Sequence, residues 1–299
     1  MIDTRKPLIG AEIAGSQKMS DFRHLIKISR PRFWLYILGP YLVGLAAGSS
    51  AAEDLLRFEV LLFGLFFLFP ANLLVYGIND VFDFETDSRN PKKAEYEMLL
   101  RPASHRATLR WIAFLNIPFI VAAYFLAPQT LPSLAGFIFF SVFYSAPPIR
   151  AKAIPIVDSL FNILYVFPAA FAYQMLTGAF PPLVVMAAAG FWTMAMHAFS
   201  AIPDIDADRE AGVNTVATLL GKNGTLAFCF AAYIGAASLS YIYFGIWVLV
   251  PLAVYIAMIG LSWVSNSESG VFSIYRRFPV VNAIVGFALF WFVAGPKFL

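Results

Sequence analysis

Long apolar runs dominate this chain of 299 residues and limit it to a membrane fold. A helix needs about 20 apolar residues to cross a hydrocarbon core of roughly 30 Å. Runs of that kind recur along the whole sequence, and charged residues make up only 13% of it, too few to cover a water-soluble protein of this size. We therefore predict an all-α, polytopic membrane protein with about nine transmembrane helices, at residues 33–50, 58–78, 108–127, 131–146, 154–175, 180–202, 224–242, 244–265 and 279–297.

Basic residues fall almost entirely on one side of these predicted spans. If the segment 1–32 defines the inside, 19 of the 21 Lys and Arg residues lie inside, and only Arg57 and Lys297 lie outside. Loops rich in Lys and Arg stay in the cytoplasm, so we expect the N-terminus and the inside loops to be cytoplasmic. Because no signal-peptide core precedes the first span, we expect that span to be retained. The whole chain, 1–299, is expected to form one transmembrane domain of the cell membrane, in contact with its lipids. Basic residues spread over membrane-proximal loops do not favour nucleic-acid binding.

An acidic cluster begins where the second span reaches the inside surface, at Asn79-Asp80-Val81-Phe82-Asp83-Phe84-Glu85-Thr86-Asp87. If the helix continues, Asn79, Asp83 and Asp87 share one face, and Asp80 flanks it. Carboxylates at this spacing repel one another and destabilise a bare helix. A divalent cation would relieve that repulsion.

A second acidic cluster, Asp204-Ile205-Asp206-Ala207-Asp208, lies at the inside end of the sixth span. Asp204 and Asp208 again share a face, and Asp206 points elsewhere. The loops 79–97 and 203–210 together hold ten of the 18 acidic residues. Carboxylate oxygens, with no His or Cys nearby, suit Mg²⁺ or Mn²⁺, and Mg²⁺ completes its shell with water and phosphate oxygens. Two facing clusters predict Mg²⁺ ions on either side of one diphosphate; a role as helix caps alone explains one cluster better than it explains two.

A third element, Tyr144-Ser145-Ala146-Pro147-Pro148-Ile149-Arg150-Ala151-Lys152, ends the fourth span on the inside. Two prolines stop the helix and leave two basic residues where a diphosphate could sit, although an ordinary positive loop would read the same way. Other inside cations could neutralise the diphosphate further: Arg89, Lys92, Lys93 and Arg101. His197 and Gln174 lie within spans, where a lone polar residue is expected to bond a neighbouring helix.

Taken in order, these three motifs resemble the UbiA superfamily of intramembrane prenyltransferases over most of the chain. The resemblance implies nine transmembrane helices around a central apolar cavity. It implies Mg²⁺-dependent ionisation of an allylic isoprenyl diphosphate, followed by attack of a lipophilic acceptor on the carbocation. By the same resemblance Asn79, Asp83, Asp204 and Asp208 would hold metal, supported by Asp80 and Asp87, with Asp83 and Asp208 essential to catalysis. Four residues would bind the diphosphate, and a tyrosine would face the cation: Arg150, Lys152, Arg101 and Ser145, with Tyr144 as the tyrosine.

The acceptor branch is indicated by the stretch Ser29-Arg30-Pro31-Arg32-Phe33-Trp34-Leu35-Tyr36-Ile37-Leu38-Gly39-Pro40, which is most similar to the lycopene elongases. These enzymes add a five-carbon unit from dimethylallyl diphosphate to lycopene, sometimes with addition of water. Leu100-Arg101-Pro102-Ala103 departs from the pattern of the quinone-forming members. Two alternatives remain: an aromatic prenyltransferase acting on 4-hydroxybenzoate or dihydroxynaphthoate, and a membrane transporter. A transporter would bury its ionisable groups near the bilayer midplane, whereas here they lie at span ends.

Overall fold

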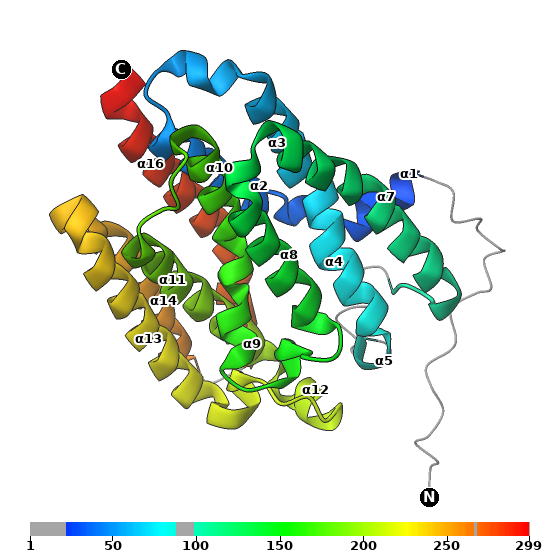
Figure 1. Cartoon of the computed structure of the whole chain (residues 1–299). Coiled ribbons are helices and arrows are strands. Elements are labelled where there is room, and N and C mark those ends of the chain that lie inside the picture. The colour runs from blue at the N-terminus through cyan, green and yellow to red at the C-terminus, as the bar shows by residue number, and fades with distance from the viewer. Residues whose placement is uncertain (1–21, 88–98, 266–267, 299) are drawn as a thin grey trace, which may run out of the picture.

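A computed structural model describes residues 22–87, 99–265 and 268–298. Every regular element within these ranges is an α-helix or a short 3₁₀ helix. The predicted all-α fold is thereby confirmed. The helices pack into one bundle, with α5 and α12 at the end of the molecule opposite the C-terminus (Figure 1).

The longer helices follow the predicted apolar runs. They are α2 (Leu35–Gly48), α3 (Phe58–Leu68), α4 (Pro70–Phe82), α7 (Pro102–Leu126), α8 (Leu131–Ser145), α10 (Phe167–Thr177), α11 (Leu183–Ala201), α13 (Val216–Phe244), α14 (Leu249–Val264) and α16 (Phe278–Phe298). Short helices join them: α1 (Phe22–Ile28), α5 (Phe84–Asp87), α9 (Val157–Leu160), α12 (Ile205–Glu210) and α15 (Glu268–Tyr275). The 3₁₀ turns that matter below are η1 (Pro31–Phe33), η2 (Ala52–Leu56), η4 (Ala151–Ala153), η5 (Phe161–Tyr165) and η6 (Ile202–Asp204).

The described residues contain six helical stretches long and apolar enough to cross a membrane. A described helix overlaps each of the nine predicted spans, but α2 and α8, with 14 and 15 residues, are shorter than a full crossing. The count of nine therefore stays a prediction. Large apolar side chains cover the outside of the bundle, as in Leu183 and Val264, which are 76% and 75% exposed. Such a surface belongs in lipid, and the protein is a multi-pass membrane protein.

Two predicted spans are interrupted helices. The second divides at Phe69 into α3 and α4, because Pro70 cannot continue the preceding helix and instead starts a new one. The fifth begins as α9 and η5 before α10 takes over. Irregular backbone is tolerated at membrane depth where protein covers it, and Pro70, Asp158 and Phe161 are all buried.

Helices α2 and α10 approach each other closely through two glycines one turn apart on α2. A Cβ atom at Gly44 would lie 2.2 Å from the carbonyl oxygen of Ala169, and one at Gly48 would lie 3.2 Å from the Cα of Tyr173. Small residues four apart let membrane helices bring their backbones together, since lipid supplies no hydrophobic drive for helix association. This contact fixes α2, and with it the segment that enters the site, against the centre of the bundle.

Replacing Gly44 with leucine should therefore separate α2 from α10. We expect Gly44→Leu to lower the free energy of unfolding by about 1–3 kcal/mol, the usual cost of overpacking. Thermal unfolding in detergent would measure it. Gly39→Leu is the matched control, because a Cβ at Gly39 in the same helix meets nothing within 4 Å. Equal losses in both variants would contradict the role given to the α2–α10 contact.

Candidate active site

The first acidic motif forms a hydrogen-bonded cluster where α4 ends. The backbone N–H of Asp83 still donates to the Asn79 carbonyl at 2.9 Å, so the two side chains keep their one-turn spacing. Asn79 Nδ2 donates to Asp83 Oδ2 at 2.6 Å and to Ser145 Oγ at 3.0 Å. Ser145 Oγ also lies 3.3 Å from Asp83 Oδ2, as its donor. Ser145 thus ties the end of α8 to the end of α4.

The helix does not continue through this motif as the one-face arrangement requires. α4 ends at Phe82, Asp83 leaves the helical conformation, and α5 restarts at Phe84. Asn79 and Asp83 share a face, as predicted, but the break re-aims the chain before Asp87. The side chain of Asp87 lies outside the part that the structure describes, as do Arg89, Lys92 and Lys93.

Lys152 pairs with Asp83 across the site. Its Nζ makes an ion pair with Asp83 Oδ1, and Asp83 is only 1% exposed. The 3₁₀ turn η4 carries Lys152 back over the site after α8 stops at Ser145 before the two prolines, as predicted. Lys152 also interacts electrostatically with Asp208. One ammonium group therefore acts on both acidic motifs.

Asp80 faces another way, toward the segment that precedes α2. Arg30 Nη2 contacts Asp80 Oδ1 at 2.6 Å, and the guanidinium also lies over the Tyr76 ring, 4.8 Å from its centroid. Arg30 holds this position in a left-handed backbone conformation (φ 52°) just before η1. Sequence analysis placed Arg30 among the inside cations and in the stretch that resembles the lycopene elongases. It did not pair Arg30 with Asp80, because nothing in a linear sequence joins residue 30 to residue 80.

The second acidic motif follows the end of α11. Asp204 closes η6 and Asp208 lies in α12, beyond the apolar residues of α11. Burial, and next the neighbouring Asp204 carboxylate, raise the pKa of Asp208 to about 6. Asp206 is exposed and lies 3.7 Å from Arg209, so it points away from this pair, as predicted. Asp208 is thus short of positive charge, which a metal ion would supply.

Tyr144 stands between the two motifs. It interacts electrostatically with both Asp83 and Asp208, and its hydroxyl lies 3.4 Å from His197 Nε2. The same His197 nitrogen is 3.8 Å from Asp158 Oδ2, and that oxygen accepts the Val216 N–H at 2.9 Å. Asp158 is fully buried. Sequence analysis gave His197 no role in the site and did not single out Asp158; their pairing depends on how α9 packs on α11.

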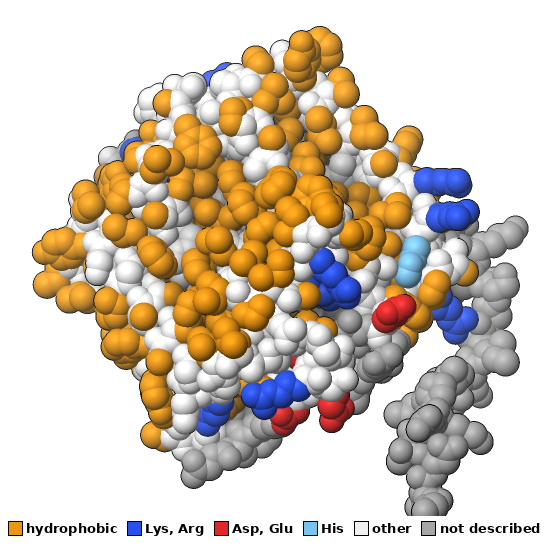
Figure 2. Space-filling model, turned by 60° about the horizontal axis from the view of Figure 1, so that its bottom comes forward, with side chains coloured by type: hydrophobic (Ala, Val, Ile, Leu, Met, Phe, Trp, Pro, Cys, Tyr) orange, Lys and Arg blue, Asp and Glu red, His pale blue; other side chains and the backbone are white. Residues whose placement is uncertain are grey.

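Two predicted diphosphate ligands lie farther out. Arg101 and Arg150 are exposed, Arg101 just before α7 and Arg150 just before η4. Gln174, by contrast, behaves as expected for a polar residue in a span: its Oε1 accepts the Ser133 hydroxyl at 2.7 Å and joins α10 to α8. Figure 2 shows the charged side chains of this face gathered toward the end that carries α5 and α12, with apolar side chains over most of the rest.

The donor set suits Mg²⁺, although no single chelating group is complete. Within 22–87, 99–265 and 268–298, no three His, Cys, Asp or Glu side chains converge as a metal site does. What the structure has instead is two pairs of oxygen donors, Asn79 with Asp83 and Asp204 with Asp208, with the Lys152 ammonium acting on both. Pairs of this size fit Mg²⁺, which takes one or two carboxylates and fills its shell from water and phosphate.

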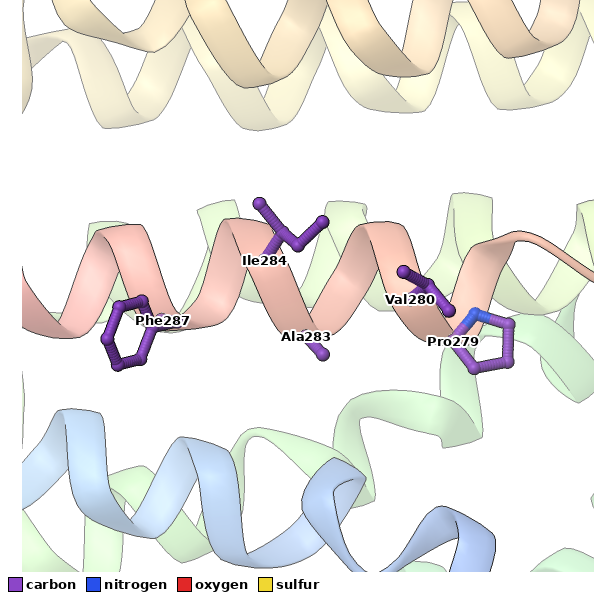
Figure 3. Close-up of a pocket in the computed structure, with 5 residues that line it drawn as sticks. All are labelled: Pro279, Val280, Ala283, Ile284 and Phe287. Carbon is purple, nitrogen blue, oxygen red and sulfur yellow. The ribbon is translucent and has the colours of Figure 1, made fainter.

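Aromatic side chains lie next to these motifs. Tyr144, and Tyr165 whose hydroxyl lies 3.4 Å from that of Tyr76, are both half-buried. A separate, open apolar hollow of about 420 Å³ runs along one side of α16, lined by Pro279, Val280, Ala283, Ile284 and Phe287 (Figure 3). That hollow faces outward, and the enclosed central cavity implied by the resemblance stays a prediction.

Fold and site together define a multi-pass membrane protein with two oxygen-donor motifs and a lysine at one end of its helical bundle. The sequence matches the UbiA prenyltransferase family over residues 37–270. This match covers well over half of the chain, and the chain belongs to that family of prenyltransferase enzymes.

Similar proteins agree with this placement. The chain is 40% identical to the lycopene elongase/hydratase of Halobacterium salinarum, covering 89% of this chain and 94% of the relative. It is also 40% identical to the lycopene elongase/hydratase of Haloferax volcanii, covering 88% and 86%. The structure of a UbiA homologue from Archaeoglobus fulgidus bound to GPP and Mg²⁺ superimposes with a TM-score of 0.66 at 21% identity, covering 91% of this chain and 99% of that one.

The pairing of Lys152 with Asp83 predicts a metal-dependent rescue. Lys152→Gln removes the ion pair that Lys152 makes with the buried Asp83 carboxylate, so we expect the free energy of unfolding to fall by about 3–5 kcal/mol. Added Mg²⁺ should restore more stability to this variant than to the parent protein, because the ion then replaces the missing positive charge. Thermal unfolding with and without MgCl₂ would measure both effects.

Lys222→Gln serves as the control for this experiment, since the Lys222 ammonium bonds the Ser265 carbonyl and no described carboxylate. It should lose less stability and gain nothing from Mg²⁺. Equal Mg²⁺ effects on the two variants would count against a cation site at Asp83.

Proposed function

We propose that this chain is a lycopene elongase that transfers a five-carbon unit from dimethylallyl diphosphate to lycopene and requires Mg²⁺. The observation that carries the proposal is Lys152, which pairs with Asp83 of the first motif and acts on Asp208 of the second. A diphosphate bound there would meet the lysine and both motifs at once. The names of the two archaeal relatives support lycopene as the acceptor.

Each residue receives a role from its position. Asn79, Asp83, Asp204 and Asp208 would hold Mg²⁺, which supplies Lewis-acid stabilisation of the diphosphate leaving group. Asp80 and Asp87 would support the first motif, Asp80 by orienting Arg30. Lys152 and Ser145 would bind the diphosphate oxygens, joined by the outer residues Arg101 and Arg150. Tyr144, between the motifs, would present its ring to the allylic cation.

The residues that lie beneath the charged end support a hydrocarbon acceptor. The residues below Arg30 are aromatic, among them Tyr76, Tyr165 and Phe33. A hydrocarbon enters such a region from the bilayer and needs no charged anchor. An aromatic acid acceptor would need a cation of its own beside those that bind the diphosphate.

Turnover in the presence of lycopene tests this function directly. Expressed in a bacterium that accumulates lycopene, the protein should yield carotenoids one or two five-carbon units heavier, seen by liquid chromatography and mass spectrometry. We expect Asp83→Asn and Asp208→Asn each to cut the yield by about two to three orders of magnitude, the usual effect of losing one preorganised electrostatic group.

Asp54→Asn is the matched control, since Asp54 lies in η2 and bonds only Ser50 and Ala51. It should leave the yield unchanged. If lycopene is unaltered although the protein is present in the membrane, lycopene is not the acceptor, and the aromatic acceptor becomes the favoured alternative. Full activity of an Asp83→Asn, Asp208→Asn double variant would contradict the proposed metal–diphosphate site. Membrane transport would then again be a candidate function.

We also propose that the acidic motifs face the cytoplasm, where soluble diphosphates are found. The distribution of Lys and Arg supports this orientation. Cys229 is the chain's one cysteine and is fully buried, so new cysteines can report the topology. In intact cells, a membrane-impermeant maleimide should label Glu53→Cys in η2 and should leave Glu85→Cys in α5 unlabelled until the cells are opened. The reverse pattern would invert the proposed topology.

A further inference from the structure

A chain of polar side chains crosses the apolar core from α14 through α16 to α2. The Tyr255 hydroxyl donates to Asn282 Oδ1 at 2.8 Å, and Asn282 Nδ2 donates to the Tyr36 hydroxyl at 3.3 Å. Asn282 Nδ2 also lies 3.2 Å from the Met196 sulfur. Tyr255 and Asn282 are buried, at 1% and 7% exposure, whereas Tyr36 is only half-buried.

The direction of these hydrogen bonds leaves the Tyr36 O–H group without an acceptor among the described residues. The Asn282 carbonyl is occupied by Tyr255, and its N–H groups reach Tyr36 and Met196. Because the Tyr36 oxygen accepts the amide hydrogen, its own O–H is left for another acceptor. Among the described residues no such acceptor is within hydrogen-bond distance. A bond between helices explains why Tyr255 and Asn282 pair; it does not explain a hydroxyl held as a donor at the accessible end.

Tyr36 lies among aromatic rings. The Phe33 ring stacks at 5.6 Å and the Tyr165 ring meets it edge-on at 6.2 Å. The Tyr165 hydroxyl in turn lies 3.4 Å from that of Tyr76, the tyrosine under Arg30. Aromatic faces in this arrangement stabilise a cation that is kept away from bulk water. The Tyr36 hydroxyl is thus a polar group at the edge of an environment suited to a carbocation.

The depth of Tyr36 places it beyond the diphosphate site. Asn282 lies four residues after Phe278, where α16 begins, and thus about 6 Å along the helix from its start. Side-chain contacts lead from the first motif through a chain of residues to Tyr36: Asp80, Arg30, Tyr76 and Tyr165. The reacting alkene of an acceptor from the bilayer must meet the prenyl cation between the acidic motifs and Tyr36.

We propose that Tyr36 binds the water molecule that adds to the elongated product, and that Asn282 positions Tyr36 for it. The proposal rests on the proposed function. When the acceptor alkene bonds to the prenyl carbon, the positive charge moves to a tertiary carbon of the product. A lone pair of the bound water forms the C–O bond, and the resulting oxonium loses a proton to the diphosphate released earlier. Without bound water, the same cation loses a C–H proton to the diphosphate and leaves as an alkene. The Tyr36–Asn282 pair therefore sets the ratio of alcohol to alkene.

Product analysis of two variants in water enriched in ¹⁸O tests this role. Tyr36→Phe removes one oxygen atom. Asn282→Leu replaces the amide with an apolar group of similar size. We expect Tyr36→Phe to lower the alcohol-to-alkene ratio by about tenfold, as loss of one hydrogen bond would, and Asn282→Leu to lower it less. Diphosphate release by both variants should stay within about threefold of the parent rate, because neither residue touches the leaving group.

Matched controls come from the same fold. Tyr41 lies five residues farther along α2 and bonds the Val60 carbonyl, and Asn116 in α7 bonds the carbonyls of Pro70 and Ile112. Tyr41→Phe and Asn116→Leu remove equivalent buried groups away from the aromatic rings around Tyr36 and should leave the product ratio unchanged. If Asn282→Leu fails to accumulate, Tyr36→Phe alone decides the outcome.

Three results would overturn the inference, and they are distinguishable. A parent-like ratio with ¹⁸O still incorporated by Tyr36→Phe would show that the water binds elsewhere. If the parent protein forms only elongated alkene and no alcohol, the proposed water site is wrong, whereas the proposed prenyl transfer is supported. If the parent protein forms no elongated product and releases no diphosphate, the proposed function is wrong, and so is the inference that rests on it.

Discussion

Hydrocarbon offers no hydrogen-bond partner to a backbone N–H or C=O, so the chain can leave the helical conformation only where protein or water covers it. The break between α3 and α4 and the turn η5 meet this condition inside the bundle, where their residues are buried. The breaks between α4 and α5 and between α11 and α12 meet it at one end of the molecule. Both acidic motifs occupy these last two breaks. The site thus lies where the helices can end without cost and the side chains can reach water-borne ligands.

The buried ion pair between Lys152 and Asp83 is weak evidence for a purely stabilising role. A buried ion pair returns little net free energy, because removing both charges from water offsets most of their attraction. Asp83 and Lys152 are nevertheless held in place by Asn79, Ser145 and the turn η4. Asp208 keeps a raised pKa because burial and Asp204 outweigh the cations near it. Among the described residues, one lysine acts on carboxylates of both acidic motifs, an arrangement suited to binding a cation together with an anion.

The sequence predicted those parts of the structure that depend on local spacing. Apolar runs located the helices, the one-turn spacing located Asn79 beside Asp83, and the two prolines located the end of α8. Contacts between distant segments were not predictable, because they depend on how the helices pack. Arg30 with Asp80, and His197 with Asp158, are joined only by tertiary structure. A face shared by Asn79, Asp83 and Asp87 was expected if the helix continued, but α4 ends at Phe82 and Asp83 leaves the helical conformation.

Prenyl transfer to a hydrocarbon requires two different environments in one enzyme. The diphosphate needs a polar, hydrated site, and its acceptor needs an apolar one. The segment from Arg30 to Tyr36 spans both. Arg30 reaches the acidic end through Asp80, while Tyr36, six residues on, lies among aromatic rings inside the bundle. Gly44 and Gly48 hold the same helix, α2, against α10. A shift of α2 would therefore move Arg30 and Tyr36 together. Close packing of this one helix thereby couples a group of the charged end to the aromatic rings inside the bundle, and for prenyl transfer the two ends of the reaction must keep a fixed geometry.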